Sequence, residues 1–375
     1  MRAKISLFFI LVPYFTVLQT PFSLQPYAVV FSLVLFWKDI WAFKYNTMNI
    51  LPLSSLIFSI ALFPTGDSLN SLRSIFNYIS YLLIFIVTIS IMNKKVYIID
   101  TVVKFCLILY IIFAVLQISF FPLIASCCVS NISSQLDLIA SGRGVSSLTP
   151  EPTFFGFILV MFLCYFIENK HYTYVSICLI GLFLLSQSTL AILCLGLAYL
   201  IEKASFLYRI KNVLALASLV SVVIVFFSNF ELNNRFFLLT KILIFDGPNA
   251  LMTDASGAGR MYHIVQPFLS FWDNYGVPHG YGGLPNGDPR ILSGIGATIY
   301  ELGYIGLPLL VHIVWNLLRI YKNTGRLIYP LFIFFAWLNA NQIGLPILIF
   351  VMTYLSFKKH GGCDNVPHRS IDLRN

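Results

Sequence analysis

Charged residues are scarce in this sequence: they make up 10% of 375 residues, whereas 58% are hydrophobic and 16% aromatic. Such a composition excludes an ordinary soluble globular protein. Long apolar runs recur along the whole chain, which indicates an integral membrane protein with many helical spans. The net charge of +9 does not indicate a nucleic-acid partner, because the lysines and arginines occur in short clusters between apolar segments, as topology signals do.

The seven cysteines include no C-x-x-C pair, and most of them lie within apolar runs. This pattern favours neither a disulfide framework nor a metal site, and we predict no cofactor. The N-terminal run from Ile5 to Leu18 is followed by no small-residue cleavage site. We therefore expect it to be a retained first span and not a signal peptide.

The apolar segments predict an all-α polytopic bundle of about twelve spans, with 1–357 as one membrane domain and 358–375 as a disordered cytoplasmic tail. They lie at about 5–20, 27–43, 50–64, 75–92, 105–124, 154–167, 173–185, 188–201, 213–228, 295–318, 327–341 and 343–357. Hydropathy alone leaves open whether the pairs divided at Ser186–Thr189 and Asn339–Gln342 are single runs or helices joined by tight turns.

The distribution of basic residues favours twelve spans with both termini in the cytoplasm. All but six of the 24 lysines and arginines then fall on the cytoplasmic side, whereas merging one ambiguous pair moves basic clusters to the other side. The six external basic residues are Arg73, Arg143, Arg235, Lys241, Arg260 and Arg290. Five of them are arginines, whose rigid guanidinium fork suits phosphate or carboxylate.

Polar residues gather in one large late loop, 229–294, and in a shorter loop at 125–152. In the shorter loop Arg143 lies between two glycines, which let the backbone approach a ligand closely. Glu151 lies between two prolines at the mouth of the next span. An ordinary loop with an acid favoured by the helix dipole is an equally good interpretation of this stretch.

The large loop contains an amphipathic stretch, 261–272, that places Arg260 and His263 one turn apart on one helix face. These two residues are candidates for the catalytic and substrate-binding groups. For His263 alone, a surface histidine on an interfacial helix is the favoured alternative.

A glycine-rich run, 276–289, follows and is suited either to a loop over a ligand or to a simple connector. It contains the candidate substrate-binding residue Tyr281. Arg290 then precedes a span containing Glu301, an acid about two turns inside an apolar helix, which needs a partner or a cavity. Arginines and carboxylates on one external face suit a lipid-linked substrate bearing a diphosphate leaving group.

The chain resembles the O-antigen polymerase (Wzy-type) family, within the superfamily that also contains O-antigen ligases. The resemblance covers nearly the whole chain in layout, although no single motif is very specific. Its features are Arg143 with Pro150-Glu-Pro-Thr-Phe-Phe-Gly156, the hairpin Leu184-Leu-Ser-Gln-Ser-Thr-Leu190, Ser256-x-x-x-Arg260 in a large late loop, and Glu301-Leu-Gly-Tyr-Ile-Gly-Leu307 in the next span.

The resemblance implies a glycosyltransferase-C-like fold in the bacterial inner membrane. It implies an enzyme that polymerises undecaprenyl-diphosphate-linked oligosaccharide repeat units at the periplasmic face, without a nucleotide sugar. By position, the family's diphosphate-binding arginines correspond to Arg143, Arg260 and Arg290, and its acid at the span mouth corresponds to Glu151. A chain-length regulator protein is a partner implied by the resemblance alone.

Two alternative functions remain open. An O-antigen ligase is similar in layout but carries a histidine shortly before the Glu-x-Gly stretch. The segment 290–300 has no histidine, and His279 lies too early to correspond to it, which favours a polymerase. A lipid-linked oligosaccharide flippase would carry charges within its spans, but apart from Glu301 these spans are nearly free of charge. No His–Asp pair suggests a membrane acyltransferase.

Overall fold

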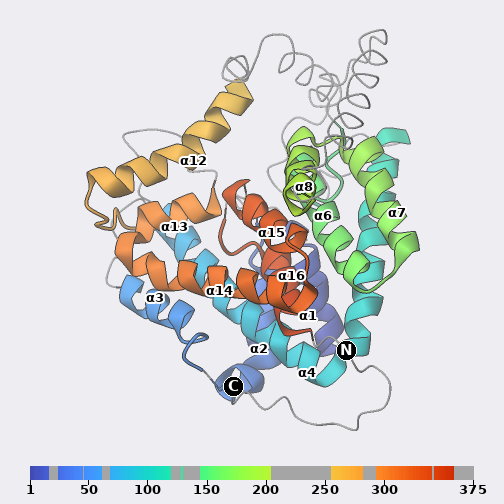
Figure 1. Ribbon diagram of the computed structural model, residues 1–375. Helices are drawn as coiled ribbons and strands as arrows, with labels where there is room; N and C mark the ends of the chain where they lie inside the picture. Colours follow the sequence, from blue (N-terminus) through green and yellow to red (C-terminus); the bar gives the residue numbers. More distant parts are fainter. Residues whose placement is uncertain are drawn as a thin grey trace.

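The computed structural model describes residues 1–16, 24–44, 46–60, 68–119, 128–129, 144–203, 255–281, 293–339 and 342–358, and this part of the chain is all-α (Figure 1). The predicted span at 213–228, most of the loop 229–294 and the tail beyond Lys358 lie outside these ranges. The helices are α1 (Arg2–Leu11), α2 (Tyr27–Trp41), α3 (Leu51–Ser59), α4 (Ser68–Ser119), α6 (Pro152–Glu168), α7 (Tyr172–Ile180) with the π-turn η3 (Gly181–Ser186), α8 (Thr189–Glu202), α12 (Ala255–Asp273), α13 (Gly294–Leu302) with the 3₁₀ turn η5 (Gly303–Gly306), α14 (Leu307–Thr324), α15 (Ile328–Asn339) and α16 (Pro346–Phe357).

Three helical stretches in the described ranges are long and apolar enough to cross a membrane, namely Ser71–Lys94, Val96–Ser119 and Gly294–Thr324. They indicate a membrane protein. Five further apolar helices, of 10–17 residues, accompany them. A helix lies over each predicted apolar segment that the structure describes, whereas the total of about twelve spans stays a prediction.

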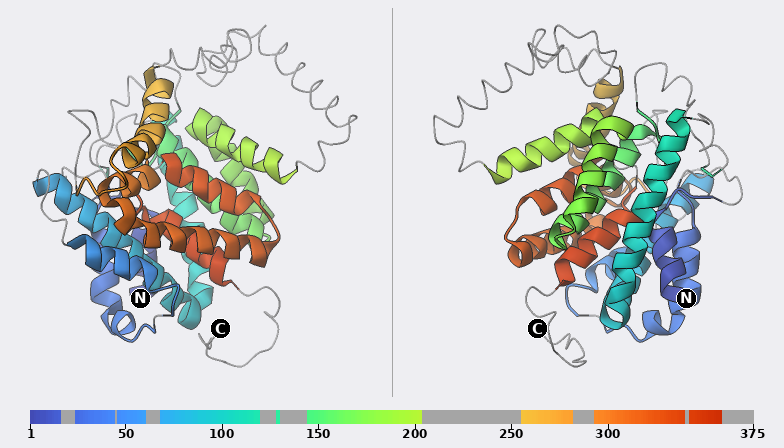
Figure 2. Two further views of the ribbon diagram at one scale, coloured as in Figure 1. Left: turned by 60° about the vertical axis from the view of Figure 1, so that its left-hand side comes forward. Right: turned by 90° about the vertical axis from the view of Figure 1, so that its right-hand side faces the viewer.

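Helix α4 contains two of these stretches and doubles back between them. Arg73 and Tyr110 both lie within electrostatic reach of Tyr14. A straight helix would separate the two residues by about 55 Å at 1.5 Å per residue, so the chain must reverse near residue 95. Figure 2 shows the second half of α4 running between α1 and the α6–α8 group. The segment between the predicted spans, 92–105, is thus helical, and the chain reverses within it.

Both pairs that hydropathy left ambiguous are separate helices. Gln187 has a left-handed φ of 46° and ends η3, and the Ser188 side chain then caps α8 by accepting a hydrogen bond from the Ala191 N–H at 3.3 Å. Farther along, α15 ends at Asn339 and α16 begins at Pro346. A proline in the first turn suits a helix start, because that position has no N–H partner to lose.

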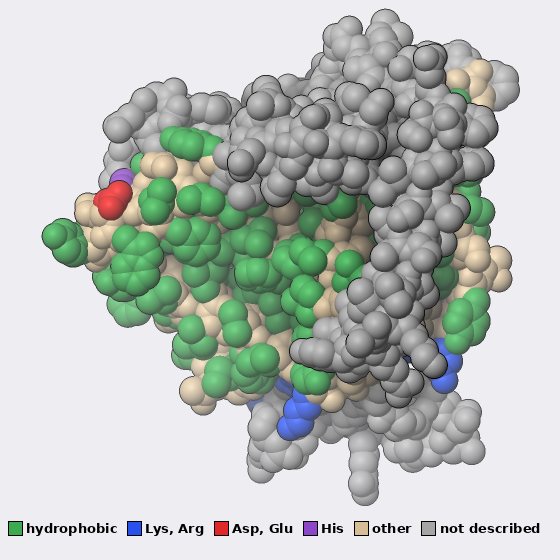
Figure 3. Space-filling model, turned by 45° about the horizontal axis from the view of Figure 1, so that its top comes forward, with side chains coloured by type: hydrophobic (Ala, Val, Ile, Leu, Met, Phe, Trp, Pro, Cys, Tyr) green, Lys and Arg blue, Asp and Glu red, His purple; other side chains and the backbone are tan. Residues whose placement is uncertain are grey.

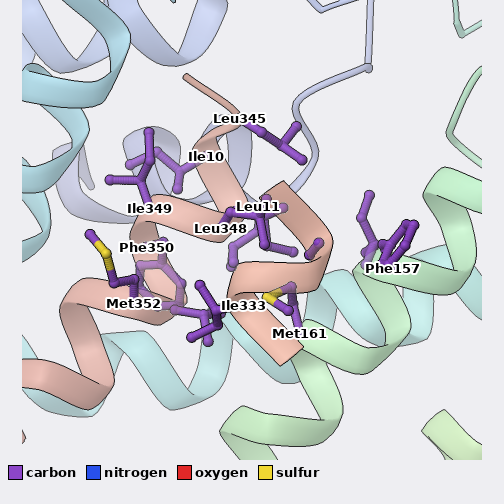
Figure 4. Packing of buried hydrophobic residues seen from close by; sticks show 14 of the residues in the cluster. Ile10, Leu11, Phe157, Met161, Ile333, Leu345, Leu348, Ile349, Phe350 and Met352 are labelled. Carbon is purple, nitrogen blue, oxygen red and sulfur yellow. The ribbon is translucent and has the colours of Figure 1, made fainter. Parts of the chain in front are cut away.

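The core forms where α16 passes through the bundle. Its sequence is apolar on every side, and every residue from Pro346 to Ser356 is buried; a helix with apolar residues all round is expected at the centre of a bundle. Helix α6 is similarly enclosed from Phe155 to Phe166. Figure 4 shows side chains of α1, α6, α15 and α16 meeting in this core. Two helices far apart in the sequence, α6 and α16, are therefore enclosed on all sides.

Polar side chains also join helices inside this apolar bundle. The hydroxyl of Tyr81 and Nδ1 of His312 are 2.8 Å apart, and the Asn316 amide donates to the His312 carbonyl at 2.9 Å. Both α14 side chains are completely buried. Sequence reasoning did not single out His312, because a histidine adds no formal charge to an apolar segment. Its contacts are those of a hydrogen-bonding group between packed membrane helices.

Ion pairs gather at one end of the bundle, which we call the basic end. Asp39 in the last turn of α2 contacts Lys94 and lies 4.0 Å from Arg2. Two further groups of polar contacts lie at this end, where the middle of α4, the turn between α6 and α7 and the end of α16 come together. They are Asp100 with His171 and Lys104, and Lys358 with Glu168 and Asn169. In Figure 3 the lysine and arginine side chains lie along one edge of the visible face. Each pair has at least one partly exposed member, and such pairs contribute little stability individually. They identify the end of the bundle at which the basic residues lie.

Gly344, in the connection before α16, sits directly against α4. A Cβ atom at this position would lie 2.3 Å from the backbone oxygen of Asn77, a contact that only a backbone shift can relieve. We expect Gly344→Ala to lower the free energy of unfolding by about 1–3 kcal/mol, the typical cost of overpacking. Thermal melting of the detergent-solubilised protein measures this effect.

The matched control is Gly196→Ala in α8, where an added Cβ meets nothing within 4 Å. Alanine has the higher helix propensity, so this variant is expected to melt at the same temperature or slightly above the wild type. Equal melting temperatures for the two variants would contradict the close approach of α4 to the α16 connection.

Candidate functional site

Polar side chains cluster at the end of the bundle opposite the basic end, which we call the site end. The first turns of α4 lie here, together with the starts of α6 and α13 and the segment 342–345. A Cβ atom on Gly294 would lie 2.8 Å from the backbone of Gln342. This close contact joins the first turn of α13 to the connection before α16.

Glu301 is buried and accepts two hydrogen bonds from α4. Its Oε1 accepts from Ser74 Oγ at 2.6 Å, and its Oε2 accepts from the Tyr78 hydroxyl at 2.8 Å. Ser74 and Tyr78 are one turn apart, so both hydroxyls face the same side of α4. Glu301 lies about two turns inside α13, as expected, and close to its end, because α13 ends at Leu302 and Gly303 takes a φ of 50°. The carboxylate thus sits at a helix end.

The backbone of the segment 276–281 is hydrogen-bonded to the end of α13 and to η5. The N–H of Gly280 donates to the Glu301 carbonyl at 3.0 Å, and the Gly276 carbonyl accepts from the Tyr304 N–H at 3.0 Å. The imidazole of His279 stacks on Tyr300 with ring centroids 4.0 Å apart. The predicted glycine-rich loop therefore follows the end of α13 closely in its described part.

Tyr281, predicted as a substrate-binding residue, has a completely buried side chain. Its hydroxyl donates to Ser59 of α3, and its carbonyl accepts from Ser71 Oγ of α4 at 2.8 Å. Burial is the main cause that raises the pKa of the Tyr281 hydroxyl. These contacts give Tyr281 a supporting position, in which it joins the loop to α3 and α4 beside the Glu301 cluster.

Arg73 projects from α4 toward Gln342. The carboxamide oxygen of Gln342 accepts from Arg73 Nη2 at 2.7 Å and from Nε at 3.0 Å, while its amide nitrogen donates to Asn77 Oδ1 at 2.9 Å. The guanidinium is half-buried. A planar guanidinium fixed along one edge is well suited to bind an anionic oxygen in a defined orientation.

Glu151 approaches the same region from α6. It is the N-cap residue of that helix in an extended conformation, and its carbonyl accepts from Thr149 Oγ1 at 2.7 Å. Tyr14, after the end of α1, lies within electrostatic reach of both Glu151 and Arg73. The Tyr14 ring also contacts Phe154 in the first turn of α6, with ring centroids 5.7 Å apart. Tyr14 thus lies near both an acid at the start of α6 and an arginine on α4.

Two of the segments that carry the family resemblance, 150–156 and 184–190, lie side by side. Ser186 Oγ donates to the Pro152 carbonyl at 3.0 Å. A Cβ atom on Gly156 would lie 2.5 Å from the Ser188 Cβ, so only glycine lets α6 approach the start of α8 this closely. This packing fixes the first turn of α6, and therefore Glu151, against the hairpin.

The sequence-predicted residues are only partly covered by the described ranges. Glu151, Tyr281 and Glu301 are described and lie at the site end. Arg143 and Arg290, together with the side chains of Arg260 and His263 on α12, lie outside the described residues.

Sequence reasoning missed Arg73, Tyr14 and Gln342 as site residues. For Arg73 a signal was present, because it is one of the six basic residues assigned to the external face. For Tyr14 and Gln342 the sequence offers no such signal, since tyrosine and glutamine are common at the ends of apolar segments.

The described cluster combines one guanidinium with two carboxylates and several hydroxyls. Such a set can bind a phosphate, accept a proton from a hydroxyl and hold both groups in place. Among the described side chains, no three His, Cys, Asp or Glu residues are grouped so that they could hold a metal ion. Comparison of the chain with protein-family models, curated proteins and solved structures gives no match.

Proposed function

We propose that this protein is a membrane glycosyltransferase that joins undecaprenyl-diphosphate-linked oligosaccharide repeat units into O-antigen or a related surface polysaccharide. The observation that carries the proposal is that the Arg73 guanidinium, oriented by Gln342, and the Glu151 carboxylate both lie near Tyr14 at the site end. A diphosphate leaving group requires a cation, and an attacking sugar hydroxyl benefits from a base. Both groups stand at one end of a membrane bundle.

The proposed orientation follows from the distribution of charge. Lysines and arginines are enriched on the cytoplasmic side of membrane proteins, so the basic end is expected to face the cytoplasm. The site end then faces the periplasm in the bacterial inner membrane. A lipid-linked substrate held in the periplasmic leaflet would present its diphosphate at the level of Arg73.

In the proposed reaction a hydroxyl at the non-reducing end of one repeat unit attacks the anomeric carbon of the growing chain. A new glycosidic C–O bond forms while the bond from the anomeric carbon to the diphosphate oxygen breaks. Glu151 accepts the proton of the attacking hydroxyl, and Arg73 stabilises the negative charge on the departing lipid diphosphate. Glu301 acts as a positioning residue by holding α4 against α13.

Arg143, Arg260 and Arg290 belong to the proposal through the family resemblance, as further cations for the diphosphate. His263 is proposed to contact the substrate, and a chain-length regulator is proposed as a protein partner. These assignments rest on matching positions in the sequence. The described residues supply an independent part of the argument, which is the Arg73–Tyr14–Glu151 arrangement.

The proposed function is tested by deleting the gene and examining the surface glycan that the cells still make. For a polymerase we expect lipid A core carrying a single repeat unit, because ligation continues without polymerisation. Gel electrophoresis and mass spectrometry of the lipopolysaccharide measure the outcome. Bare lipid A core would point to a ligase or a flippase and would overturn the proposal, as would an unchanged ladder of chain lengths.

A further inference from the structure

Helix α12 packs on the rest of the protein by one face. Pro267 is buried against α13, where a Cβ on Gly296 would lie 3.0 Å from the proline Cγ. Phe271 makes an edge-to-face contact with Tyr304 of η5, with ring centroids 5.2 Å apart. Because Pro267 and Phe271 are four residues apart, they define one side of the helix. Figure 1 shows α12 at the edge of the molecule, beside α13.

The opposite face of α12 is apolar and exposed. The exposed side chains recur at helical spacing and are Tyr262, Val265, Phe268, Leu269 and Trp272. Trp272 is 72% exposed, and Tyr275, just beyond the helix, is 85% exposed. Among the α12 side chains that the structure describes, Asp273 is the single charged one, at the end of the helix. Such a face is unfavourable in water.

A second exposed apolar surface runs along α14, which follows the η5 turn that α12 contacts. Leu307, Val311, Val314 and Leu318 form an exposed apolar row at helical spacing, typical of a lipid-facing surface. Exposed tyrosines, Tyr304 and Tyr321, stand at the two ends of the row. They are about 25 Å apart at 1.5 Å per residue, close to the hydrocarbon thickness of about 30 Å.

Tyrosine and tryptophan favour the boundary between lipid and water. We therefore expect Tyr304 to lie at this boundary at the site end, and Tyr321 to lie at it at the basic end, one residue before Lys322. Phe271 packs directly on Tyr304, so α12 lies at the same level as the boundary. An amphipathic helix in this position would bury its apolar face about 5–10 Å into the region between headgroups and acyl chains.

We propose that the exposed face of α12 is a membrane-binding surface that rests on the bilayer interface at the site end. The partner is the lipid surface itself, recognised by an apolar row with tryptophan and tyrosine. Helix α12 continues into the 276–281 segment, whose backbone is bound to Glu301 and Tyr304. Binding of α12 to the bilayer surface would therefore fix the position of the candidate site relative to the membrane. This inference requires only that the chain is a membrane protein, and it is independent of the proposed glycosyl transfer.

Tryptophan fluorescence in brominated lipids tests this surface in the full-length protein. The wild type and Trp272→Phe are reconstituted into phosphatidylcholine vesicles brominated at shallow or at deep acyl positions. The emission lost in Trp272→Phe is the contribution of Trp272. We expect this contribution to be quenched several-fold more by shallow than by deep bromines, and to resist quenching by aqueous iodide. Trp272 is highly exposed, and phenylalanine keeps an aromatic ring beside Phe271, so we expect the packing of α12 to be retained.

Trp337→Phe is the matched control, because Trp337 is completely buried in α15. Its contribution is expected to resist bromines at both depths and iodide alike. Two outcomes overturn the proposal. Quenching of Trp272 by iodide and not by lipid would mean that the face is in water. Protection of Trp272 from both reagents would mean that a second copy or another protein covers the face.

Discussion

Replacing Arg73 with alanine is expected to reduce polymerisation by about 10²–10³, the usual cost of removing one electrostatic group from a transition state. The physical reason is that the guanidinium is held by Gln342 in a fixed orientation at the site end. Without the guanidinium, no preorganised cation at this position stabilises the negative charge that develops on the departing diphosphate. In cells carrying this variant we expect surface polysaccharide limited to one or a few repeat units.

The Arg73→Lys variant tests whether the positive charge alone is sufficient or whether the planar guanidinium geometry is also required. Lysine keeps the positive charge but lacks the planar fork that Gln342 holds by two hydrogen bonds. We expect activity between those of the alanine variant and the wild type, with substrate binding retained better than turnover. An assay with purified protein and lipid-diphosphate-linked repeat units gives both quantities.

The matched control is Arg326→Ala at the basic end. Arg326 is an exposed arginine near Tyr329 of α15, so the variant loses the same charge far from the site end. Its polysaccharide ladder is expected to equal that of the wild type. Normal ladders from Arg73→Ala, at wild-type protein levels in the membrane, would remove Arg73 from the proposed reaction.

The apolar pattern of the sequence predicted most of the helices, because a helix in lipid must satisfy its backbone internally and carry apolar side chains. It predicted the amphipathic helix at 261–272, which the structure extends to Ala255–Asp273. It also predicted that the chain reverses between the spans at 75–92 and 105–124, but not that α4 stays helical from Ser68 to Ser119 through this region. Lys94 and Lys95 indicated a turn, but helical hydrogen bonding continues on both sides of them in a way that a hydropathy profile does not reveal.

The candidate site was only partly predictable. Glu151 and Glu301 were identified because an acid beside an apolar span is costly and therefore informative. Arg73 lay among the external arginines but was passed over, since no motif surrounds it. Its importance comes from Gln342, which is about 270 residues away in the sequence and reaches Arg73 only through the packing of α16 against α4. Contacts of this range depend on how helices pack, and hydropathy does not specify helix packing.

Replacing Glu301 is expected to have the second large effect, through the structure of the site end. In Glu301→Ala the buried hydroxyls of Ser74 and Tyr78 lose their acceptor. Leaving buried polar groups unsatisfied costs about 1–3 kcal/mol, so the melting temperature should fall. Because the loop at 276–281 is hydrogen-bonded to the same end of α13, we also expect polymerisation to fall strongly.

Glu301→Gln distinguishes a positioning role from a chemical one. Glutamine keeps the volume and one acceptor oxygen, and a hydroxyl can rotate to accept from its amide group. If Glu301 positions α4 and α13, the Gln variant should keep most of the stability and activity. A Gln variant that melts like the wild type but is inactive would instead assign the carboxylate to the reaction. Ser74→Ala and Tyr78→Phe each complete a double-mutant cycle with Glu301→Ala, for which direct contact predicts a coupling energy of about 0.5–3 kcal/mol.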